Sequence, residues 1–549
     1  MSGKGKGKGA GKKAARQQQQ QAAARRRAAR GVRDVPLPKT QETPETRETP
    51  KPSNPAPEPV KVHYYADVAA VRIQDWLGRT PGLMFRRGAS ALLSKATDPR
   101  EWQHKLPENV RWNDEAGHVD GVVPLVADES VPGDDAPKVL RDAAREVARR
   151  MRDLMPHCPL QAVTGSGPSY AEAYTEIAKT RQEGRFLLDW PAPPPEVILA
   201  KPCQQCRQAA ATVPGVNVFK DDKPDLCAEC NSRFEAAGRT SASSARFEPA
   251  PERRLREALA GTGMTVTGFA DNFAEMAEAG RRGRDDAASQ IAVIYADGNR
   301  VGAFLSRAAA AQNGPRKSEI ASVIDRAAIG ALAAAVRTCF PGKAEPPVLP
   351  HLAGGDDLLV SVPASAAWLF TMTLLEEFGR QIAAKTGTWA AVIRQHPPTL
   401  SAGLVFHHST YPFSDVVRLA GERLRAAKIA TAGRESSIAF LDVTADGGQP
   451  PQHRKSLDLE YLRKHKDRFR RTAALPASRR ATLLDLARRE AWDDFIARLT
   501  DFPDEPLWEF AAGTESATAA KAKEKLRNDS GRRHEVRRAL DVARHWEGK

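Results

Sequence analysis

The chain has 549 residues, 41% of them hydrophobic, and is therefore long enough to form several domains with separate cores. Its net charge of +15 comes from the two ends: residues 1–60 hold 14 Lys and Arg against 5 Asp and Glu, and residues 450–549 hold 23 against 17. Because no apolar run approaches the ~20 residues of a membrane span and no apolar signal core is present, we expect a cytoplasmic protein with no membrane partner. Its basic ends suit contact with nucleic acid.

The first 62 residues are of low complexity. They alternate Gly with Lys, continue through glutamines at 17–21 and an Ala/Arg block, and end in Pro/Thr/Glu repeats. Such a composition cannot bury enough apolar surface to offset the entropy lost on ordering, so residues 1–62 are predicted to be a disordered basic tail. A tail of this kind serves nucleic-acid contact or solubility equally well.

Residues 63–198 mix short apolar runs with amphipathic stretches, a pattern that predicts a first domain of the α/β kind. Asp135 and Pro137 open its most strongly helical stretch. The predicted strands are 64–71, 121–126 and 159–163, and the predicted helices lie within 72–96 and 139–155.

Residues 199–250 carry four cysteines in two CxxC pairs. Cys203 and Cys206 form the first pair, and Cys227 and Cys230 follow after 20 intervening residues. Tetrahedral Zn²⁺ takes four thiolates from two tight turns, so this spacing predicts a structural zinc ribbon that leaves no coordination position open for chemistry. Disulfides are the alternative, which a cytosolic chain disfavours.

A second α/β domain is predicted for residues 251–448. Its elements follow the order β-α-β-β-α-β of a ferredoxin-like fold. The predicted strands are 291–296, 348–353, 358–362, 400–407 and 437–443, and the predicted helices lie around 320–335, 366–384 and 414–428. Because residues 449–549 look wholly helical, the predicted fold class is α+β: two ferredoxin-like domains, the first degenerate, with a zinc ribbon insert and an all-helical C-terminal domain.

Three aspartates of the second domain are candidate metal ligands. Asp297 ends the strand 291–296, and Asp356 and Asp357 belong to the tight turn Gly354-Gly355-Asp356-Asp357 between two apolar strands. In this fold the first two strands run parallel, so the end of the first strand and the turn that leaves the second share one edge of the sheet. Carboxylates gathered there repel one another unless a divalent cation compensates them, and Mg²⁺ accepts such ligands together with substrate phosphates.

Phosphate-binding groups are predicted beside these carboxylates. Backbone N–H groups of Gly298, Asn299 and Arg300 follow Asp297 at a predicted strand-to-helix turn, and Lys428 ends a helix that reaches the same place. Each part has a purely structural reading as well: Gly-Gly-Asp-Asp is good hairpin chemistry, and a lysine at a helix C-terminus complements the helix dipole. The ordered combination favours nucleotide chemistry with two metal ions.

Four segments of the second domain resemble the active palm of the large subunit of type III CRISPR effector complexes, in the CRISPR polymerase/cyclase family. They are IYADGNRVGAF (294–304), HLAGGDDLLVSV (351–362), SAGLVFHH (401–408) and RLRAAK (423–428). The stretch 67–96, followed by GHVDGVVPLV (117–126), resembles the first palm of the same family. The resemblance covers about residues 63–549.

The resemblance implies synthesis of cyclic oligoadenylate from ATP when the complex has bound target RNA. It implies that Asp297 and Asp356 ligate Mg²⁺ or Mn²⁺ with Asp357 in support, while the first palm holds the partner nucleotide. The implied partners are the other subunits of the effector complex, its guide RNA and its target RNA. The family's nuclease domain carries an adjacent His-Asp pair that this sequence lacks, so we predict no metal-dependent DNase here.

Two other functions fit the same residues. One is a standalone signalling cyclase that makes a cyclic dinucleotide, with the basic tail used for localisation. The other is a non-catalytic subunit whose palm binds nucleotide while the zinc ribbon and basic helices assemble a ribonucleoprotein.

Overall fold

The part of the chain from Val60 to Lys549 forms one compact unit. The predicted tail at residues 1–62 lies almost wholly outside the part of the chain that is described. The computed structural model describes residues 61–117, 121–192, 201–218, 223–237, 249–270, 272–281, 289–310, 317–384, 393, 395, 397–451, 454–501, 506–513 and 519–546.

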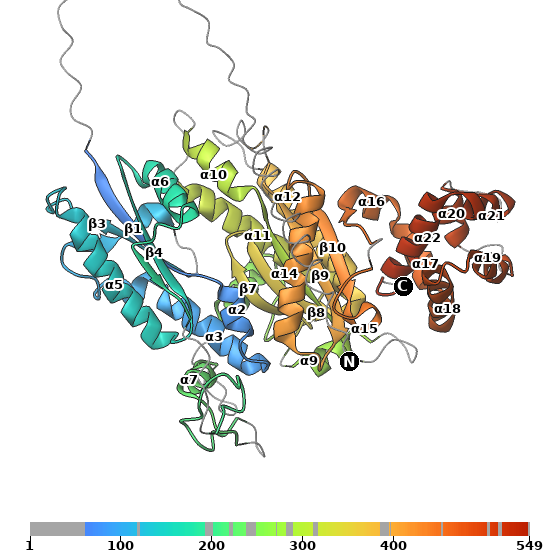
Figure 1. Cartoon of the computed structure of the whole chain (residues 1–549), viewed down its shortest axis with the longest axis horizontal. Coiled ribbons are helices and arrows are strands. Elements are labelled where there is room, and N and C mark those ends of the chain that lie inside the picture. Colours follow the sequence, from blue (N-terminus) through green and yellow to red (C-terminus); the bar gives the residue numbers. More distant parts are fainter. Residues whose placement is uncertain are drawn as a thin grey trace, which may run out of the picture. The chain divides into compact units, whose positions relative to one another are not determined.

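The first sheet has five strands in the order β2-β3-β1-β4-β5, and its central strand β1 is antiparallel to both β3 and β4 (Figure 1). The strands and helices predicted in this region are confirmed. Its strands are β1 (His63–Ala70), β2 (Val110–Trp112), β3 (Val122–Ala127), β4 (Leu160–Gly167) and β5 (Leu188–Trp190), and its helical segments are α2 (Ile73–Gly78), α3 (Leu83–Ala96), α4 (Pro99–Trp102), η1 (Asp114–Ala116), α5 (Ala136–Leu154) and α6 (Tyr170–Gln182).

Helix α5 shows why this sheet forms. It begins directly after Asp135 with a proline in its first turn, and it buries a stripe that includes Leu140, Val147 and Met151. This stripe packs with the inward side chains of β1, β3 and β4 in one core. The opposite face of α5 is charged and exposed, as expected for a helix that covers one side of a sheet.

The second sheet has six strands in the order β11-β10-β9-β6-β8-β7. Strand β6 is antiparallel to β8 and to β9, and β8 is antiparallel to β7, so β6 and β7 run in the same direction with β8 between them. Strands β9 and β10 are parallel and are joined by a helical crossover. The strands are β6 (Gln290–Asn299), β7 (Leu349–Gly354), β8 (Asp357–Pro363), β9 (Thr399–His408), β10 (Ser437–Asp442) and β11 (Leu457–Asp458).

Helices cover both faces of the second sheet. Alternate residues of β6 enter different cores: Ile294 packs with α11 and α12, whereas Val293 packs with α14. The helices predicted around 320–335, 366–384 and 414–428 are therefore confirmed. The helical segments of this region are α8 (Ala250–Ala260), α9 (Phe273–Ala279), α10 (Val301–Ala310), α11 (Lys317–Cys339), η2 (Ala364–Ala366), α12 (Ala367–Ala383), α14 (Phe413–Ala430) and α15 (Val443–Asp446).

The C-terminal region is mostly helical, but the prediction that it is wholly helical is wrong. Its first residues form β11, in which buried Leu457 pairs with Ile438 and covers the edge of β10. An uncovered edge strand exposes unpaired N–H and C=O groups, which explains this short addition. The helices that follow are α16 (Leu459–Lys464), α17 (Lys466–Ala473), α18 (Ala477–Arg488), α19 (Trp492–Thr500), α20 (Leu507–Ala512), α21 (Ala519–Asn528) and α22 (Ser530–Ala543).

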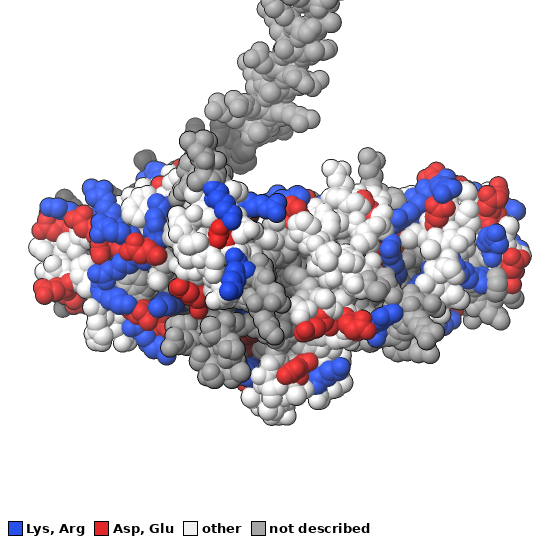
Figure 2. All heavy atoms as spheres, turned by 90° about the horizontal axis from the view of Figure 1, so that it is seen from below, with Lys and Arg blue, Asp and Glu red and all other residues white. Residues whose placement is uncertain are grey.

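Many arginines of this region serve the fold. Arg468 and Arg471 both contact Glu509, and the buried Asp541 accepts ion pairs from Arg454 and Arg488. On the face of the molecule in Figure 2, basic and acidic side chains are interspersed. Some of the positive charge of the C-terminal region is thus neutralised in ion pairs within the protein. Among the helices that the structure describes, none combines the length and apolarity that a bilayer crossing requires.

Candidate active site

The candidate site is built around the turn between β7 and β8. Gly354 pairs with Asp357 to close the hairpin, which leaves Gly355 and Asp356 as its two turn residues. Gly355 has φ of +61°, a left-handed conformation that glycine adopts without strain and that hairpin turns require at this position. The Gly-Gly pair therefore places Asp356 at the tip and Asp357 at the first position of β8.

Two residues from neighbouring helices fasten this turn. Asp325 of α11 accepts a hydrogen bond of 2.9 Å from the backbone N–H of Gly355. Arg254 of α8 forms an ion pair with Asp325 and donates to the carbonyl of Ala353. Neither residue is predicted from the sequence, because nothing in the residues around Asp325 distinguishes it from a surface carboxylate.

Asp297 lies at the same edge of the sheet as this turn. Ala296 of β6 is opposite Leu358 of β8, so Asp297 comes level with the first residue of β8. Strand β6 runs three residues further than predicted, because Asp297, Gly298 and Asn299 remain paired with β9. Gly298 and Asn299 are thus strand residues, and Arg300, with φ of +55°, makes the turn into α10 alone.

Gly298 provides the close contact between β6 and the turn. A Cβ atom built on Gly298 would lie 2.2 Å from Oδ2 of Asp356 and 2.4 Å from Cγ2 of Val301. No real side chain tolerates such contacts, so the carboxylate of Asp356 rests directly against the Gly298 backbone. Glycine is required here because Asp356 occupies the place of a side chain.

We predict that Gly298→Ala displaces Asp356 and lowers the rate of any reaction at this site by at least about 10-fold, at a stability cost of about 1–3 kcal/mol for overpacking. Gly302→Ala is the matched control, because no described atom outside the chain neighbours and backbone of α10 lies within 4 Å of the Cβ that it adds. Product formation and thermal unfolding of both variants check this. Equal activity of the two variants would contradict the placement of Asp356.

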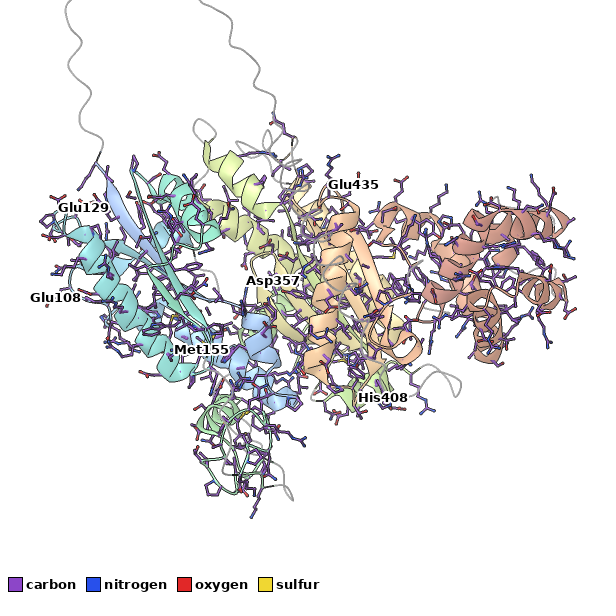
Figure 3. The ribbon with its side chains drawn as sticks, in the orientation of Figure 1. Glu108, Glu129, Met155, Asp357, His408 and Glu435 are labelled. Carbon is purple, nitrogen blue, oxygen red and sulfur yellow. The ribbon has the colours of Figure 1, made fainter. Side chains whose placement is uncertain are left out.

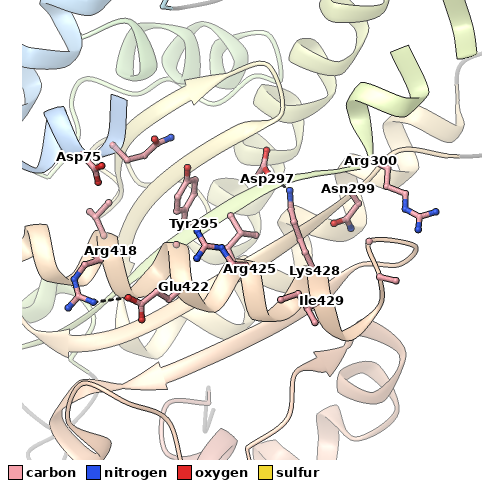
Figure 4. Close-up of a pocket in the computed structure, with 16 residues that line it drawn as sticks. Asp75, Tyr295, Asp297, Asn299, Arg300, Arg418, Glu422, Arg425, Lys428 and Ile429 are labelled. Carbon is pink, nitrogen blue, oxygen red and sulfur yellow. Dashed lines mark hydrogen bonds and ion pairs between the residues drawn. The ribbon is translucent and has the colours of Figure 1, made fainter. Parts of the chain in front are cut away.

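Lys428 of α14 reaches Asp297 directly, as Figure 4 shows. Its ammonium group forms an ion pair with Oδ2 of Asp297 and donates to the carbonyl of Gly298 at 2.7 Å. Both side chains are about one-third exposed. The predicted convergence of Lys428 with the end of β6 is therefore seen in the structure.

An open hollow of about 750 Å³ lies beside this ion pair, large enough for a nucleotide. Asp297, Asn299, Arg300 and Lys428 line it together with residues not predicted from the sequence (Figure 4). The additional lining side chains that carry charge or an aromatic ring are Asp75, Tyr295, Arg418, Glu422 and Arg425.

The side chain of Asn299 is already committed to the fold. Its Nδ2 donates to Thr399 Oγ1 at 2.9 Å, to Ser401 Oγ at 3.0 Å and to the carbonyl of Glu435 at 3.1 Å. These three bonds tie the end of β6 to β9 and to the loop before β10. Asn299 thus stabilises the backbone that lines the hollow. Its buried Oδ1 has no hydrogen-bond partner among the described residues.

The electrostatics of the turn are those of crowded carboxylates. Burial and the charge of Asp297 raise the pKa of Asp356 to about 6. Burial, and then the charges of Asp297 and Asp356, raise the pKa of Asp357 well above its ordinary value. Burial and the charge of Asp357 likewise raise the pKa of Tyr295. Burial is the largest cause of each shift, and the neighbouring carboxylates add to it.

Asp357 is held by two side chains that the sequence analysis missed. Gln74 Nε2 of α2 donates to Oδ2 of Asp357 at 2.9 Å, and the Tyr295 hydroxyl lies 3.5 Å from the same oxygen. The other carboxylate oxygen, Oδ1, is buried and has no hydrogen-bond partner among the residues that the structure describes. Figure 3 marks Asp357 beside α2, the helix that carries Gln74.

The donor set at this edge fits a hard divalent cation. It consists of carboxylate oxygens, one of them bare and buried, and such oxygens are the ligands of Mg²⁺ and Mn²⁺. The three aspartates do not yet form one compact ligand group, since Lys428 engages Asp297 and Gln74 engages Asp357. Cation binding would therefore need Asp297 and Asp357 to leave these partners.

The four predicted zinc ligands do come together. The Sγ atoms of Cys203, Cys206, Cys227 and Cys230 all lie within 4.8 Å of one another, and all four residues are buried. Cys206 and Cys227 have their sulfurs 3.8 Å apart, which is about the edge of a zinc–thiolate tetrahedron with bonds of about 2.3 Å. Within the described part of the chain, this is the set of His, Cys, Asp or Glu side chains whose ligand atoms already lie close enough together to share one metal.

The second cysteine pair belongs to helix α7 (Ala228–Ala236), which packs tightly on α3 of the first sheet (Figure 1). A Cβ atom on Gly88 of α3 would lie 1.6 Å from the carbonyl oxygen of Arg233, so the two backbones touch at this glycine. Glu229 and Arg233 form a buried ion pair of 2.6 Å beneath the contact. The cysteine module is thereby fixed to the first sheet.

The second sheet with its carboxylate-bearing hairpin defines a palm domain. Residues 290–438 match the family model of the Cas10/Cmr2 second palm domain. This match confirms the resemblance to the large subunit of type III CRISPR effector complexes.

Comparisons of whole proteins add likenesses at low identity. The structure aligns with a solved Csm1-Csm4 cassette in complex with cA4 at a TM-score of 0.49 and 16% identity, covering 88% of this chain and 70% of that chain. It aligns with the same kind of cassette in complex with pppApApA at a TM-score of 0.48 and 16% identity, covering 89% and 69%. With a cassette in complex with one ATP the TM-score is 0.46 at 15% identity, covering 87% and 70%. No curated protein matches the sequence.

Proposed function

We propose that this chain is a metal-dependent nucleotidyltransferase that makes cyclic oligoadenylate from ATP, as the large subunit of a type III CRISPR effector complex. The observation that carries the proposal is the shared edge of the Cas10/Cmr2 palm. There Asp297 and Lys428 line a nucleotide-sized hollow, and Asp356 of the Gly-Gly-Asp-Asp turn lies against Gly298, the residue that follows Asp297. The paired carboxylates and the bare oxygen of Asp357 support a cation site at the same edge.

The reaction would join two nucleotides at this edge. The 3′-oxygen of one ATP forms a bond to the α-phosphorus of a second ATP, and the bond from that phosphorus to pyrophosphate breaks. Asp297, Asp356 and Asp357 would hold Mg²⁺ or Mn²⁺, which lowers the pKa of the attacking hydroxyl and neutralises charge on the phosphates. Repetition of the step, and a final attack on the chain's own 5′ end, closes the ring.

The basic residues of the hollow orient the triphosphate. Lys428 forms an ion pair with Asp297. With a cation bound to Asp297, the Lys428 ammonium group would be available to the β- and γ-phosphates. Arg300 and Arg425 line the same hollow and offer further donors to phosphate. Because Gly298 has no side chain, Asp356 lies directly against the end of β6, where it would hold the cation together with Asp297.

The proposal includes the architecture around the site. Both sheets are ferredoxin-like palms, because β9-β6-β8-β7 and β4-β1-β3-β2 repeat one strand order with antiparallel neighbours. The domain boundaries remain 63–198, 199–250, 251–448 and 449–549. The first palm holds the partner nucleotide and does not catalyse. Its strand carboxylate Asp67 is buried and accepts a hydrogen bond of 2.8 Å from the Tyr170 hydroxyl, which explains the lack of catalysis.

The cofactors and partners follow from the same assignment. Cys203, Cys206, Cys227 and Cys230 hold a structural Zn²⁺, while hydrogen bonds from the other three cysteines lower the pKa of Cys203 and favour its thiolate. The other subunits of the complex, its guide RNA and its target RNA are the macromolecular partners. The C-terminal helices contact the small helical subunit or the guide–target duplex.

The function is tested by incubating the purified full-length chain with ATP and Mg²⁺ or Mn²⁺, alone and in a complex with guide and target RNA. Products are resolved by mass. Cyclic oligoadenylate that appears only with the complex and target RNA supports the proposal. A cyclic dinucleotide from the isolated chain would establish a standalone cyclase, and nucleotide binding without product in every condition would establish a non-catalytic subunit.

A further inference from the structure

A residue of α2, the helix that follows the first strand of the first sheet, contacts a carboxylate of the second sheet. Gln74 lies 283 positions before Asp357 in the sequence, yet its side-chain amide donates to Oδ2 of Asp357 at 2.9 Å. Gln74 also lines the hollow beside Asp297. The candidate site therefore receives a polar group from α2, outside the palm that carries its carboxylates.

This contact fixes how Asp357 presents its two oxygens. Both donors near the carboxylate, the Gln74 amide and the Tyr295 hydroxyl, approach Oδ2. Among the described residues, the buried Oδ1 has no hydrogen-bond partner. A buried carboxylate oxygen without a partner costs free energy, and a cation bound to Oδ1 would offset that cost.

Helix α2 is held firmly enough to position a side chain. It has six residues and begins after Arg72, whose φ is +51°. The Trp76 indole donates to Glu229 Oε1 at 2.7 Å, and Arg233 donates to the Trp76 carbonyl at 2.9 Å. The Arg233 guanidinium also lies 4.5 Å from the centre of the Trp76 ring. Gln74 thus lies on a short helix that is bonded through Trp76 to helix α7, which follows Cys227.

We propose that Gln74 is a positioning residue that orients Asp357 toward the catalytic cation from across the boundary between the two palms. This inference rests on the proposed function, since it concerns the cation site of that reaction. Gln74 touches no reacting atom; it acts through the Asp357 carboxylate. Groups that orient metal ligands in this way usually change metal affinity by about 10- to 100-fold when they are removed.

The test compares Gln74→Ala and Gln74→Glu with the unaltered full-length chain in its complex with target RNA. Gln74→Ala removes the donor, and Gln74→Glu keeps the size of the side chain while placing a second carboxylate against Asp357. We expect the Mg²⁺ concentration for half-maximal product formation to rise by about 10-fold in Gln74→Ala and by more in Gln74→Glu. Excess Mn²⁺ should restore most of the maximal rate, because the cation site itself is intact.

The matched control is Gln161→Ala on β4. The Gln161 amide also donates to an aspartate, Asp189 Oδ1 at 3.2 Å, but this contact is exposed and lies outside the site. Its half-saturating Mg²⁺ concentration should equal that of the unaltered chain. Thermal unfolding of all variants shows whether the fold is preserved.

A second readout separates this inference from the proposed function. Mn²⁺ binding in the presence of a non-hydrolysable ATP analogue, measured by electron paramagnetic resonance, requires no turnover. Weaker Mn²⁺ binding in both Gln74 variants supports the positioning role even if the unaltered chain makes no oligoadenylate. Unchanged Mn²⁺ and Mg²⁺ dependence in both variants, or a lower maximal rate that no metal concentration restores, would overturn it.

Discussion

Replacing Asp356 and Asp357 together by asparagine is expected to abolish oligoadenylate synthesis, with a fall in rate of more than about 100-fold. Removal of groups that only orient metal ligands already lowers metal affinity or activity by about 10- to 100-fold. Asparagine keeps the shape of the turn and supplies no negative oxygen. Mass-resolved product formation with Mg²⁺ and target RNA checks this. The consecutive pair Asp493 and Asp494 is the matched control, since both are exposed on α19 and their change to asparagine should leave synthesis unaltered.

The same double variant is expected to be more stable than the unaltered chain at neutral pH without divalent metal. The folded chain raises the pKa of Asp356 to about 6 from an ordinary value of 3.8, so between these values the folded state holds a proton that the unfolded state has released. Stability therefore falls as pH rises through about 4 to 6 and stays lower above it. Asp357 shifts in the same direction.

The asparagine variant has no carboxyl groups at these positions, so it does not lose stability in this way as the pH rises. Its melting temperature should exceed that of the unaltered chain by a few degrees at pH 7.5, and the difference should shrink toward pH 4. Adding Mg²⁺ with an ATP analogue should stabilise the unaltered chain and leave the variant unmoved. A variant that is less stable than the unaltered chain at every pH would show that the carboxylates are structural partners rather than a repelling pair.

The sequence was most informative where periodicity and turn chemistry agree. The helix predicted around 320–335 lies within α11, and Gly354-Gly355 between two apolar runs forms the hairpin as predicted. The shared edge for Asp297 and the hairpin followed from the parallel direction of β6 and β7, which the strand register bears out. Local pattern and one rule of chain topology were sufficient for these features.

The parts that the sequence did not reveal are contacts between distant segments. Gln74 sits in a short helix with no motif of its own, and its partner Asp357 lies 283 residues away. Asp325 lies on an otherwise ordinary helix, and its bond to the Gly355 N–H is visible only once α11 is packed on the hairpin. The excess length of β6 was missed because Gly298 and Asn299 favour turns locally, whereas pairing with β9 decides their conformation.

The second large effect is expected at the cysteine cluster. Changing Cys227 and Cys230 to serine removes two of four thiolates and should abolish zinc binding, measured as metal content of the purified chain. The module has a small apolar core, in which Phe85, Val218 and Leu226 surround the cysteines. A core of this size does not hold a fold without a metal, so helix α7 should unfold locally.

Loss of α7 should extend into the first palm. Gly88 of α3 lies directly against the backbone of Arg233, and Trp76 of α2 depends on Glu229 and Arg233 for its hydrogen bonds. Hydrogen exchange should therefore accelerate in residues 73–96 as well as 223–237, while α11 and β10 keep their protection. Cys339→Ser, outside the cluster, is the control and should retain full zinc content.

The effect of zinc loss on product formation shows whether the zinc site stabilises only its own module or also positions Asp357. Because α2 carries Gln74, a chain without zinc should need more Mg²⁺ for half-maximal product formation, in the same direction as Gln74→Ala. The serine variant combined with Gln74→Ala should then be little worse than either alone, since both changes remove one support of Asp357. Additive losses would instead mean that zinc stabilises the first palm without reaching the carboxylates.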